Sequence, residues 1–310
     1  MYTRLFGISL LLILGYAYVA APPLSFVPGT TLTIARGESL TSIAEKLRAE
    51  HIITHAASFK YIVTFFGEGR GIQAGAYRFT AAENAFVVAR RMIVGDYGVP
   101  PARITFIEGS TVREMAAQIN ELIPTVTQEE FIALANADEG YLFPDTYLFS
   151  LSTDAPGIRN ALRDNFEKKI TTIQDDIRRS GHSLSEIVTM ASLVEKEAST
   201  AADRRIVAGI LWNRLARNMP LQVDAVFGYI FNRSTYSPSP KDLKVDSPYN
   251  TYAHRGLPPG PIGNPGLDAL QAAASSTATK YLYYLTGNDG LMHYAATYTE
   301  HQANLKKYLY

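Results

Sequence analysis

The segment MASLVEKEAS, residues 190–199, carries two glutamates, Glu195 and Glu197, in an otherwise apolar helical pattern. Residues at i and i+2 of a helix point about 200° apart, so the two carboxylates cannot face the same bond of a substrate. A glutamate beside an apolar stripe is usually a surface residue or an ion-pair partner, and Arg204 and Arg205 are candidate partners. In an aromatic-lined groove, desolvation would instead raise its pKa and make it a general acid near neutral pH. At most one of the two is therefore expected to be catalytic, and periodicity alone does not choose between them.

The other reactive residues match none of the other common catalytic or cofactor-binding motifs. The chain has no cysteine, which removes disulfides and thiol catalysis, and it contains no P-loop, GxGxxG or GxSxG motif. His51 and His55 have i,i+4 spacing, but no third ligand is near in sequence and we expect no metal site. His293 and His301 are more typical of polar anchors. A glutamate with many Tyr, Asn and Asp side chains beside stiff loops is typical of a carbohydrate-binding groove.

The helix that carries the two glutamates has a clear start. Ser183 and Glu186 form a capping box, in which each side chain satisfies a free backbone amide at the helix start. The core stripe of this helix is Leu184, Ile187, Ala191, Val194 and Ala198. The pattern predicts a further helix over Asp203–Leu215 and a long one before it, from Pro156 to Arg179.

Two stretches of the N-terminal half resemble each other at a constant offset of 72 residues. Each predicts a strand, a glycine turn and a helix, and seven positions correspond: Leu32/Ile104, Gly37/Gly109, Ser39/Thr111, Leu40/Val112, Ile43/Met115, Ala44/Ala116 and Leu47/Ile119. Thr111 and Glu114 form a capping box in the second stretch. Two copies of one small unit explain the match, although strand–turn–helix patterns also resemble each other by chance.

The remaining patterns complete a mixed α+β fold. A helix over Ala56–Phe66 and a strand over Gly75–Phe79 predict a small α+β module at about residues 30–100, and Thr127 caps a helix that runs to about Ala135. The aromatic stretch GYLFPDTYLF, residues 140–149, is interrupted by Pro144 and is expected to be a loop or strand edge. Residues 256–266, GLPPGPIGNPG, form a stiff loop, and a hairpin and a short helix end the chain.

The first residues differ from the rest of the chain. Residues 5–21 carry no charge and are at the short end of what spans a hydrocarbon core of roughly 30 Å. One basic residue, Arg4, precedes this run and two prolines follow it, which favours an uncleaved anchor with its N-terminus inside. A cleaved signal peptide, with Val19 and Ala21 at positions −3 and −1, and a core helix are the alternatives.

Charge and composition exclude some classes of partner. The chain has 29 Lys and Arg residues against 29 Asp and Glu residues, and no basic block stands out, so we expect no nucleic-acid binding. Its hydrophobic content of 47% and charged content of 19% are ordinary for a folded protein of roughly two domains.

Five sequence blocks, in this order along the chain, resemble the endolytic murein transglycosylase family. They are EGYLFPDTYLF (139–149), MASLVEKEAS (190–199), VAGILWNRLARNMPLQVDAV (207–226), SPYNTYAHRGLPPGPIGNPG (247–266) and HYAATYTEHQ (293–302). The resemblance implies an N-terminal transmembrane helix (1–22), a LysM-like α+β module (30–100) and a larger α+β catalytic domain (103–310). It also implies a single-pass protein of the bacterial inner membrane with its catalytic domain in the periplasm.

The same resemblance implies the reaction. Members of the family cut nascent peptidoglycan strands between N-acetylmuramic acid and N-acetylglucosamine, leave a 1,6-anhydro end, need no cofactor or metal, and so limit strand length. In the family motif the second glutamate of E-K-E is catalytic, which corresponds to Glu197, with Glu195 as the fallback. Because the muramyl 6-hydroxyl is the nucleophile, one carboxyl suffices as acid and then base.

The resemblance implies sugar-binding residues in two groups. Tyr141, Asp145 and Tyr147 would line one side of the groove, with Gln222, Asp224, Tyr249 and Asn250 opposite and Pro258–Pro261 as a wall. Asp145 and Asn250 are equally suited to capping or closing turns. Ala225 stands where a proline is usual, a departure expected to affect loop stiffness more than chemistry.

Two other readings remain open. A noncatalytic, membrane-tethered murein-binding scaffold is the alternative to an enzyme, and hydrolysis by water is the alternative reaction. Peptidoglycan synthases of the elongation machinery are expected partners from the resemblance alone.

Overall fold

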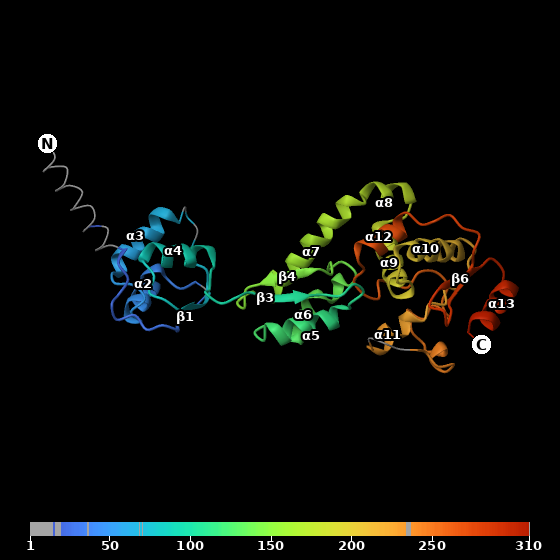
Figure 1. Cartoon of the computed structure of the whole chain (residues 1–310), viewed down its shortest axis with the longest axis horizontal. Coiled ribbons are helices and arrows are strands. Elements are labelled where there is room, and N and C mark those ends of the chain that lie inside the picture. The colour runs from blue at the N-terminus through green and yellow to red at the C-terminus, as the bar shows by residue number, and fades with distance from the viewer. Residues whose placement is uncertain are drawn as a thin grey trace. The chain divides into compact units, whose positions relative to one another are not determined.

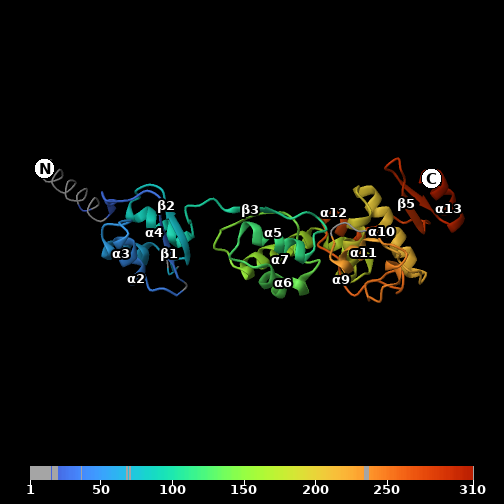
Figure 2. The same cartoon turned by 90° about the horizontal axis from the view of Figure 1, so that it is seen from below.

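The computed structural model describes residues 20–309 and Gly15, except residues 36, 68, 70 and 234–236. The chain divides into two compact units, residues 1–102 with 149–152, and residues 103–148 with 153–310. Both combine helices with short strands, which confirms the predicted α+β class (Figures 1 and 2). The segment 5–21, predicted to span a membrane, lies outside the described residues except for Gly15, Ala20 and Ala21. Within the described part, no helix is both long and apolar enough to cross a bilayer.

The first unit packs helices against a two-stranded antiparallel sheet. Leu32 of one strand lies opposite Tyr77 of the other, and both side chains are buried. The elements of the unit are β1 (Thr30–Ile34), α2 (Leu40–Ala49), α3 (Ala56–Phe66), β2 (Gly75–Phe79) and α4 (Ala85–Val94). Phe59, Phe79 and Leu47 fill the core between sheet and helices.

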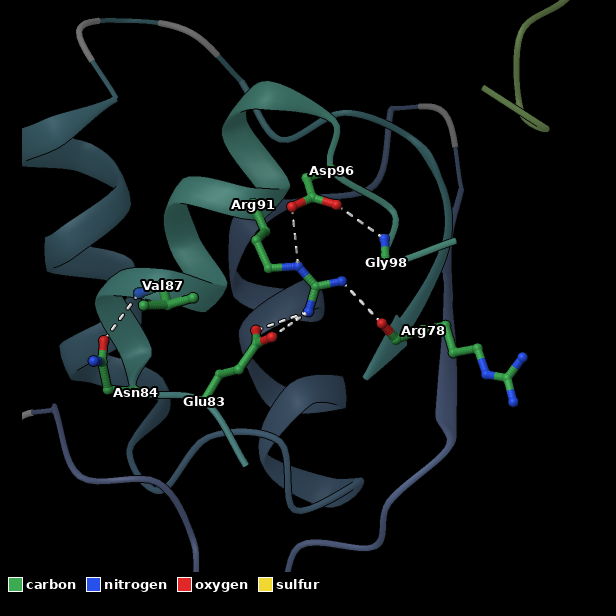
Figure 3. A network of polar contacts seen from close by, with 7 residues as sticks. All are labelled: Arg78, Glu83, Asn84, Val87, Arg91, Asp96 and Gly98. Carbon is green, nitrogen blue, oxygen red and sulfur yellow. Dashed lines mark hydrogen bonds and ion pairs between the residues drawn. The ribbon is translucent and has the colours of Figure 1, made fainter. Parts of the chain in front are cut away.

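A buried arginine ties α4 to β2 in this unit (Figure 3). The Arg91 guanidinium lies 2.7 Å from a carboxylate oxygen of Glu83 and donates a hydrogen bond to the backbone carbonyl of Arg78 at 2.9 Å. Asn84 caps the start of α4 by accepting a hydrogen bond from the Val87 N–H. Because the charge of Arg91 is paired with Glu83 and Asp96 and its guanidinium also donates to a backbone carbonyl, it can be buried without a large desolvation penalty.

The second unit begins with a strand pair and four helices. Its first elements are β3 (Ala102–Thr105), α5 (Val112–Leu122), α6 (Gln128–Ala135), the 3₁₀ turn η1 (Asn136–Asp138), β4 (Thr146–Phe149), α7 (Ala155–Thr172) and α8 (Gln174–Ser180). The strands β3 and β4 form a second two-stranded sheet. Helix α6 packs against both α5 and α7.

The second half of this unit surrounds α9, the helix of the two glutamates. The elements are α9 (Leu184–Glu197), α10 (Ala201–Ala216), α11 (Ala225–Phe231), η2 (Asp242–Lys244), α12 (Leu267–Ala274), β5 (Tyr283–Thr286), β6 (Met292–Ala295) and α13 (Tyr298–Tyr308). Helix α12 packs against both α9 and α10 through small side chains, among them Ala269, Ala272 and Ala273. Small residues let helices approach closely, so the end of α9 is held firmly.

Most local predictions are confirmed. Both capping boxes, Thr111–Glu114 and Ser183–Glu186, are present, and the C-terminal hairpin is antiparallel. Both predicted strand–turn–helix stretches form, with Ser39 and Thr111 as helix N-caps; whether they are copies of one unit stays a prediction.

One predicted helix is interrupted, and some helices were not predicted. The helix expected from Pro156 to Arg179 breaks at Ile173, just after Thr171 and Thr172 turn their hydroxyls back to the carbonyls of Lys168 and Lys169. Such back-bonding weakens the helical ladder. The sequence patterns did not predict α4, α11 or α12; α12 begins directly after the proline-rich loop, which ends at residue 266.

Candidate active site

Glu197 is the last residue of α9 and is only partly buried. The helix ends there because Ala198 takes an extended conformation, with φ −139° and ψ 136°. The Tyr284 hydroxyl, from β5, donates a hydrogen bond of 2.8 Å to Oε2 of Glu197. The backbone N–H of Ala225, at the start of α11, lies near enough to this carboxyl group to oppose the rise of its pKa. Elements far apart in sequence therefore fix one carboxyl group.

The surroundings favour the protonated form of this carboxyl group. Burial raises the pKa of Glu197 to about 7, and the nearby negative charge of Asp224 adds to the effect, while the hydrogen bond from Tyr284 opposes it. The negative end of the α9 macrodipole acts in the same direction as burial. A carboxyl group with this pKa can donate a proton near neutral pH and take one back.

Glu195 has a structural environment. Its side chain is 3% exposed and pairs with Arg204, which is one of the two ion-pair partners predicted from the sequence. The other carboxylate oxygen accepts a hydrogen bond of 2.8 Å from the Gly266 N–H, at the start of α12. Both oxygens are thus engaged, and Glu195 joins α9, α10 and α12.

Two cavities meet at Glu197, and Glu197 and Asp224 line both. The larger, of about 810 Å³, is lined also by Thr111, Arg113, Glu114, Ala117, Gln128, Ile132, Asn136, Glu139, Lys196, Ala225, Gly228, Tyr229, Asn232, Arg233 and Ile262. The smaller, of about 340 Å³, is lined also by Arg214, Gln222, Tyr252, Tyr283, Tyr284, Leu285, Thr286, Tyr298 and His301. A carboxyl group between two cavities is suited to act on a bond whose two sides bind separately.

Two of the predicted sugar-binding residues lie beside Glu197. Gln222 lines the smaller cavity and takes a left-handed conformation, φ +53°, while its backbone N–H is bonded to the carbonyl of Thr251. Asp224 accepts a hydrogen bond of 2.5 Å from the Tyr252 hydroxyl. This places a second carboxylate close enough to influence Glu197.

The predicted residues Tyr141, Asp145 and Tyr147 line neither cavity. The Tyr141 ring packs against Phe166, with ring centroids 5.2 Å apart. Asp145 and Tyr147 both accept hydrogen bonds from the Asn165 amide, at 3.2 and 2.9 Å, and Asp145 also caps the Thr146 N–H at 2.8 Å. The three therefore hold the start of β4 against α7, and their contact with a sugar stays a prediction.

Tyr249 and Asn250 also lie outside the linings of both cavities. Asn250 is fully buried; its amide donates to the carbonyls of Leu243 and Val245, at 3.0 and 2.9 Å, and its carbonyl accepts from the Tyr252 N–H. This is the turn-closing role that the sequence left open. The Tyr249 ring packs on Tyr229, which lines the larger cavity, with centroids 5.0 Å apart.

Several residues of the site were not singled out from the sequence. Tyr284 lies on the predicted hairpin among other tyrosines, and nothing in the pattern indicated which one bonds to Glu197. Arg214 is 6% exposed under the smaller cavity and donates to the carbonyls of Leu282 and Leu221, both at 2.7 Å.

Glu139 is a buried carboxyl group that also lines the larger cavity. Its carboxyl oxygens accept the Val112 N–H, at the start of α5, at 3.1 and 3.2 Å and the Asn264 amide at 3.0 Å. The same Asn264 amide donates to the carbonyl of Ser110, and its oxygen accepts the Leu142 N–H. Burial raises the pKa of Glu139 to about 7. The signal was present in the sequence, since Glu139 begins the block EGYLFPDTYLF.

One residue of the proline-rich loop lines the larger cavity, whereas Pro258–Pro261, the predicted wall, line neither cavity. Ile262 lines the larger cavity, and its N–H donates to the buried Ser192 hydroxyl of α9 at 3.0 Å. Ala225 lies beside Glu197, where its N–H opposes the rise of the Glu197 pKa and a proline would offer no N–H; that the departure affects loop stiffness more than chemistry stays a prediction. Among the described residues, no group of three or more His, Asp or Glu side chains is arranged to hold a metal ion.

Comparisons with known proteins agree on one family. A sequence profile described as the YceG-like family matches residues 32–307. The chain is 31% identical over 305 residues to an endolytic murein transglycosylase of Bacillus subtilis. The match covers 90% of this chain and 84% of that protein. It is 26% identical over 321 residues to one of Streptococcus pneumoniae, and the match covers 90% of this chain and 58% of that longer protein. The 2.6 Å crystal structure of a YceG-like protein from Listeria monocytogenes is similar with a TM-score of 0.61 and 30% identity, covering 88% of this chain and 98% of that one.

Proposed function

Because the chain belongs to the YceG-like family, we propose that it is an endolytic murein transglycosylase, a lyase that cuts within the glycan strands of peptidoglycan. The observation that carries the proposal is the position of Glu197. Its carboxyl group lies where two cavities meet and has a pKa of about 7. The bond cleaved is that between N-acetylmuramic acid and N-acetylglucosamine, and the product ends in 1,6-anhydro-N-acetylmuramic acid.

The reaction uses Glu197 twice. The protonated carboxyl group gives its proton to the glycosidic oxygen as the bond between that oxygen and muramyl C1 breaks, and N-acetylglucosamine leaves with a new hydroxyl. The muramyl 6-hydroxyl then bonds to C1, and the Glu197 carboxylate takes the hydroxyl proton. The acid is restored and no water is consumed.

The environment of the other groups is consistent with a single catalytic carboxyl group. Glu195 is held in its ion pair with Arg204 and cannot reach the cavities without breaking it. Burial raises the pKa of the Tyr284 hydroxyl well above 10, so this group stays protonated and orients Glu197 as a hydrogen-bond donor. Asp224 contributes negative charge that favours the protonated form of Glu197.

The cellular setting is part of the proposal. Residues 5–21 form a single-pass anchor in the inner membrane, residues 30–100 a LysM-like module and residues 103–310 the catalytic domain on the periplasmic side. The substrate is the nascent glycan strand, and cutting it ends elongation. Peptidoglycan synthases at the same membrane are the expected partners.

The test is mass spectrometry of products from uncrosslinked glycan strands and the full-length protein. The wild type is expected to give 1,6-anhydro ends, and Glu197→Gln to give none while its circular dichroism spectrum is unchanged. Glu195→Gln is the matched variant. It is expected to lower stability, because Arg204 loses its buried partner, and to retain turnover in the protein that remains folded.

Three results would contradict the proposal in different ways. Activity lost only in Glu195→Gln would exchange the roles of the two glutamates. Reducing ends in place of anhydro ends, lost in Asp224→Asn, would indicate hydrolysis by a pair of carboxyl groups. Strand binding without any cleavage would indicate a scaffold.

A further inference from the structure

The two cavities beside Glu197 differ in chemistry. Tyrosine rings dominate the smaller one, which suits stacking on a sugar. Three basic residues, Arg113, Lys196 and Arg233, line the larger one, which has more than twice the volume. The two sugars of murein also differ. Only muramic acid carries a peptide, and that peptide bears carboxylates that basic side chains could bind.

The acidic side chains of the larger cavity are engaged within the protein. Glu114 accepts the N–H of Thr111 at 2.8 Å as part of the capping box. Glu139 accepts the Val112 N–H and the Asn264 amide, and Asp224 accepts the Tyr252 hydroxyl. These carboxyl groups already have hydrogen-bond donors from the protein.

Two basic side chains of the same cavity are not engaged in this way. Arg113 and Lys196 are exposed, and neither forms an ion pair or a side-chain hydrogen bond with any residue in the part of the chain that the structure describes. Arg113 projects from the first turn of α5, and Lys196 lies between the two glutamates of α9. The Lys196 ammonium also lies close to Gly109, in the turn before α5. Two cationic side chains from different elements therefore flank the larger cavity and are available to an anionic ligand.

We propose that the larger cavity binds the muramic acid at the cleaved bond together with its acidic peptide, whose carboxylates pair with Arg113 and Lys196. The inference rests on the proposed function. It fixes the direction of the strand: the muramyl residue that becomes the anhydro end lies in the larger cavity, and the leaving N-acetylglucosamine lies among the tyrosines of the smaller one. The enzyme then recognises the peptide as well as the glycan.

The test compares two substrates of equal size. Uncrosslinked strands with native peptides and strands whose peptide carboxylates have been converted to amides are cleaved by the full-length protein, and kcat and KM are measured on each. The wild type is expected to prefer native strands about tenfold in kcat/KM, mostly through KM, since two partly exposed ion pairs contribute about this much. In the double variant Arg113→Gln/Lys196→Gln, the ratio of kcat/KM on native strands to kcat/KM on amidated strands is expected to fall to about one.

Matched variants separate charge from structure. Arg113→Lys/Lys196→Arg keeps both charges and is expected to keep the preference. Lys168→Gln, an exposed lysine of α7 that lines neither cavity, is expected to do the same.

Two results would overturn the inference while the proposed function stands: equal cleavage of both substrates by the wild type, or a preference that survives in the double glutamine variant. Failure of the proposed function is recognised separately, because the wild type would then form no anhydro ends on either substrate.

Discussion

The two glutamates of α9 illustrate how position decides the role of a residue. Both carboxyl groups are shielded by protein, yet Glu195 is neutralised by Arg204 and Glu197 faces open cavities. A spacing of two residues turns them to opposite sides of the helix, as expected from helical geometry. One side of the helix end is therefore structural, and the other carries the carboxyl group that we propose as the catalytic acid.

The hydrogen bond from Tyr284 leads to a prediction about pH. In Tyr284→Phe, the ionised form of Glu197 loses a donor, so the pKa of Glu197 should rise above about 7. The acid must be protonated to act, so the alkaline limb of the kcat/KM profile should move up by about one pH unit, which corresponds to one hydrogen bond of ordinary strength. Initial rates between pH 5 and 9 measure the shift.

Tyr283→Phe is the control for this prediction. The Tyr283 ring lines the same cavity, but its hydroxyl is not bonded to Glu197. The alkaline limb should stay in place. An unmoved limb in Tyr284→Phe would mean that Glu197 is not the acid whose ionisation the profile reports.

The sequence predicted the site in part, for reasons visible at single residues. The family motif predicts Glu197 as the catalytic residue, and in the structure Glu197 lines two cavities, one of them together with Gln222 and Asp224; the roles of these residues stay predictions. Tyr284 and Asn264 were missed because their roles depend on contacts across 87 and 125 residues, to Glu197 and Glu139. Asn250 is a polar residue in a family block, yet the structure shows it bonded to its own loop.

At the scale of elements, the turn before the aromatic block is closely packed. Gly140 has φ +86°, and a Cβ at this position would lie 2.4 Å from Cγ of Pro261 in the proline-rich loop. Only glycine adopts this conformation readily and permits so close an approach. The close contact between the proline-rich loop and the turn after Glu139 therefore requires a residue without a Cβ at position 140.

Gly140→Ala is expected to destabilise the second unit. Gly181, at the end of α8, is the matched position because it has φ +75° and a Cβ there would have no atom of the described residues within 4 Å apart from its chain neighbours. Gly181→Ala should cost about 1 kcal/mol from backbone strain alone. Gly140→Ala should cost about 2 kcal/mol more, because the methyl group overlaps Pro261. Native-state hydrogen exchange of the slowest α9 amides measures both, and equal costs would contradict the packing argument.

Element predictions succeeded where local signals were strong. Capping boxes located the starts of α5 and α9, and two aromatic-rich runs around a tight turn located β5 and β6. Helix α12 was missed because Gly266 gives no capping side chain and prolines precede it; burial against α9 and α10 stabilises it instead. Such tertiary contacts are not visible in a local pattern.

At the scale of the whole molecule, each unit has its own core, and the candidate site lies within the second. The stability of that unit should depend on pH through Glu139. Its pKa is about 7 in the folded protein and about 4.5 when unfolded, so the folded state binds more protons between these values. The stabilisation is present below about pH 4.5 and is lost as pH rises through about 7.

Glu139→Gln removes this dependence and keeps an oxygen that can accept the Val112 N–H. The difference in unfolding free energy between the variant and the wild type should grow by on the order of 3 kcal/mol from pH 4.5 to 8, in favour of the variant. Hydrogen exchange of α9 amides, corrected for intrinsic rates, gives the measurement. Glu167→Gln, at an exposed carboxylate of α7, should show no such change. A constant difference for Glu139→Gln would contradict the raised pKa.

Trp212 gives the molecule an optical property of its own. It is the single tryptophan of the chain, its ring is stacked on the His182 imidazole with centroids 3.6 Å apart, and its indole N–H is bonded to the Ala273 carbonyl at 3.0 Å. All three residues belong to the second unit. Tryptophan emission therefore reports on the unit that contains Glu197 without any added label, and the first unit contributes no tryptophan emission. Fluorescence and circular dichroism recorded in one denaturant titration would show whether the two units melt together or one after the other.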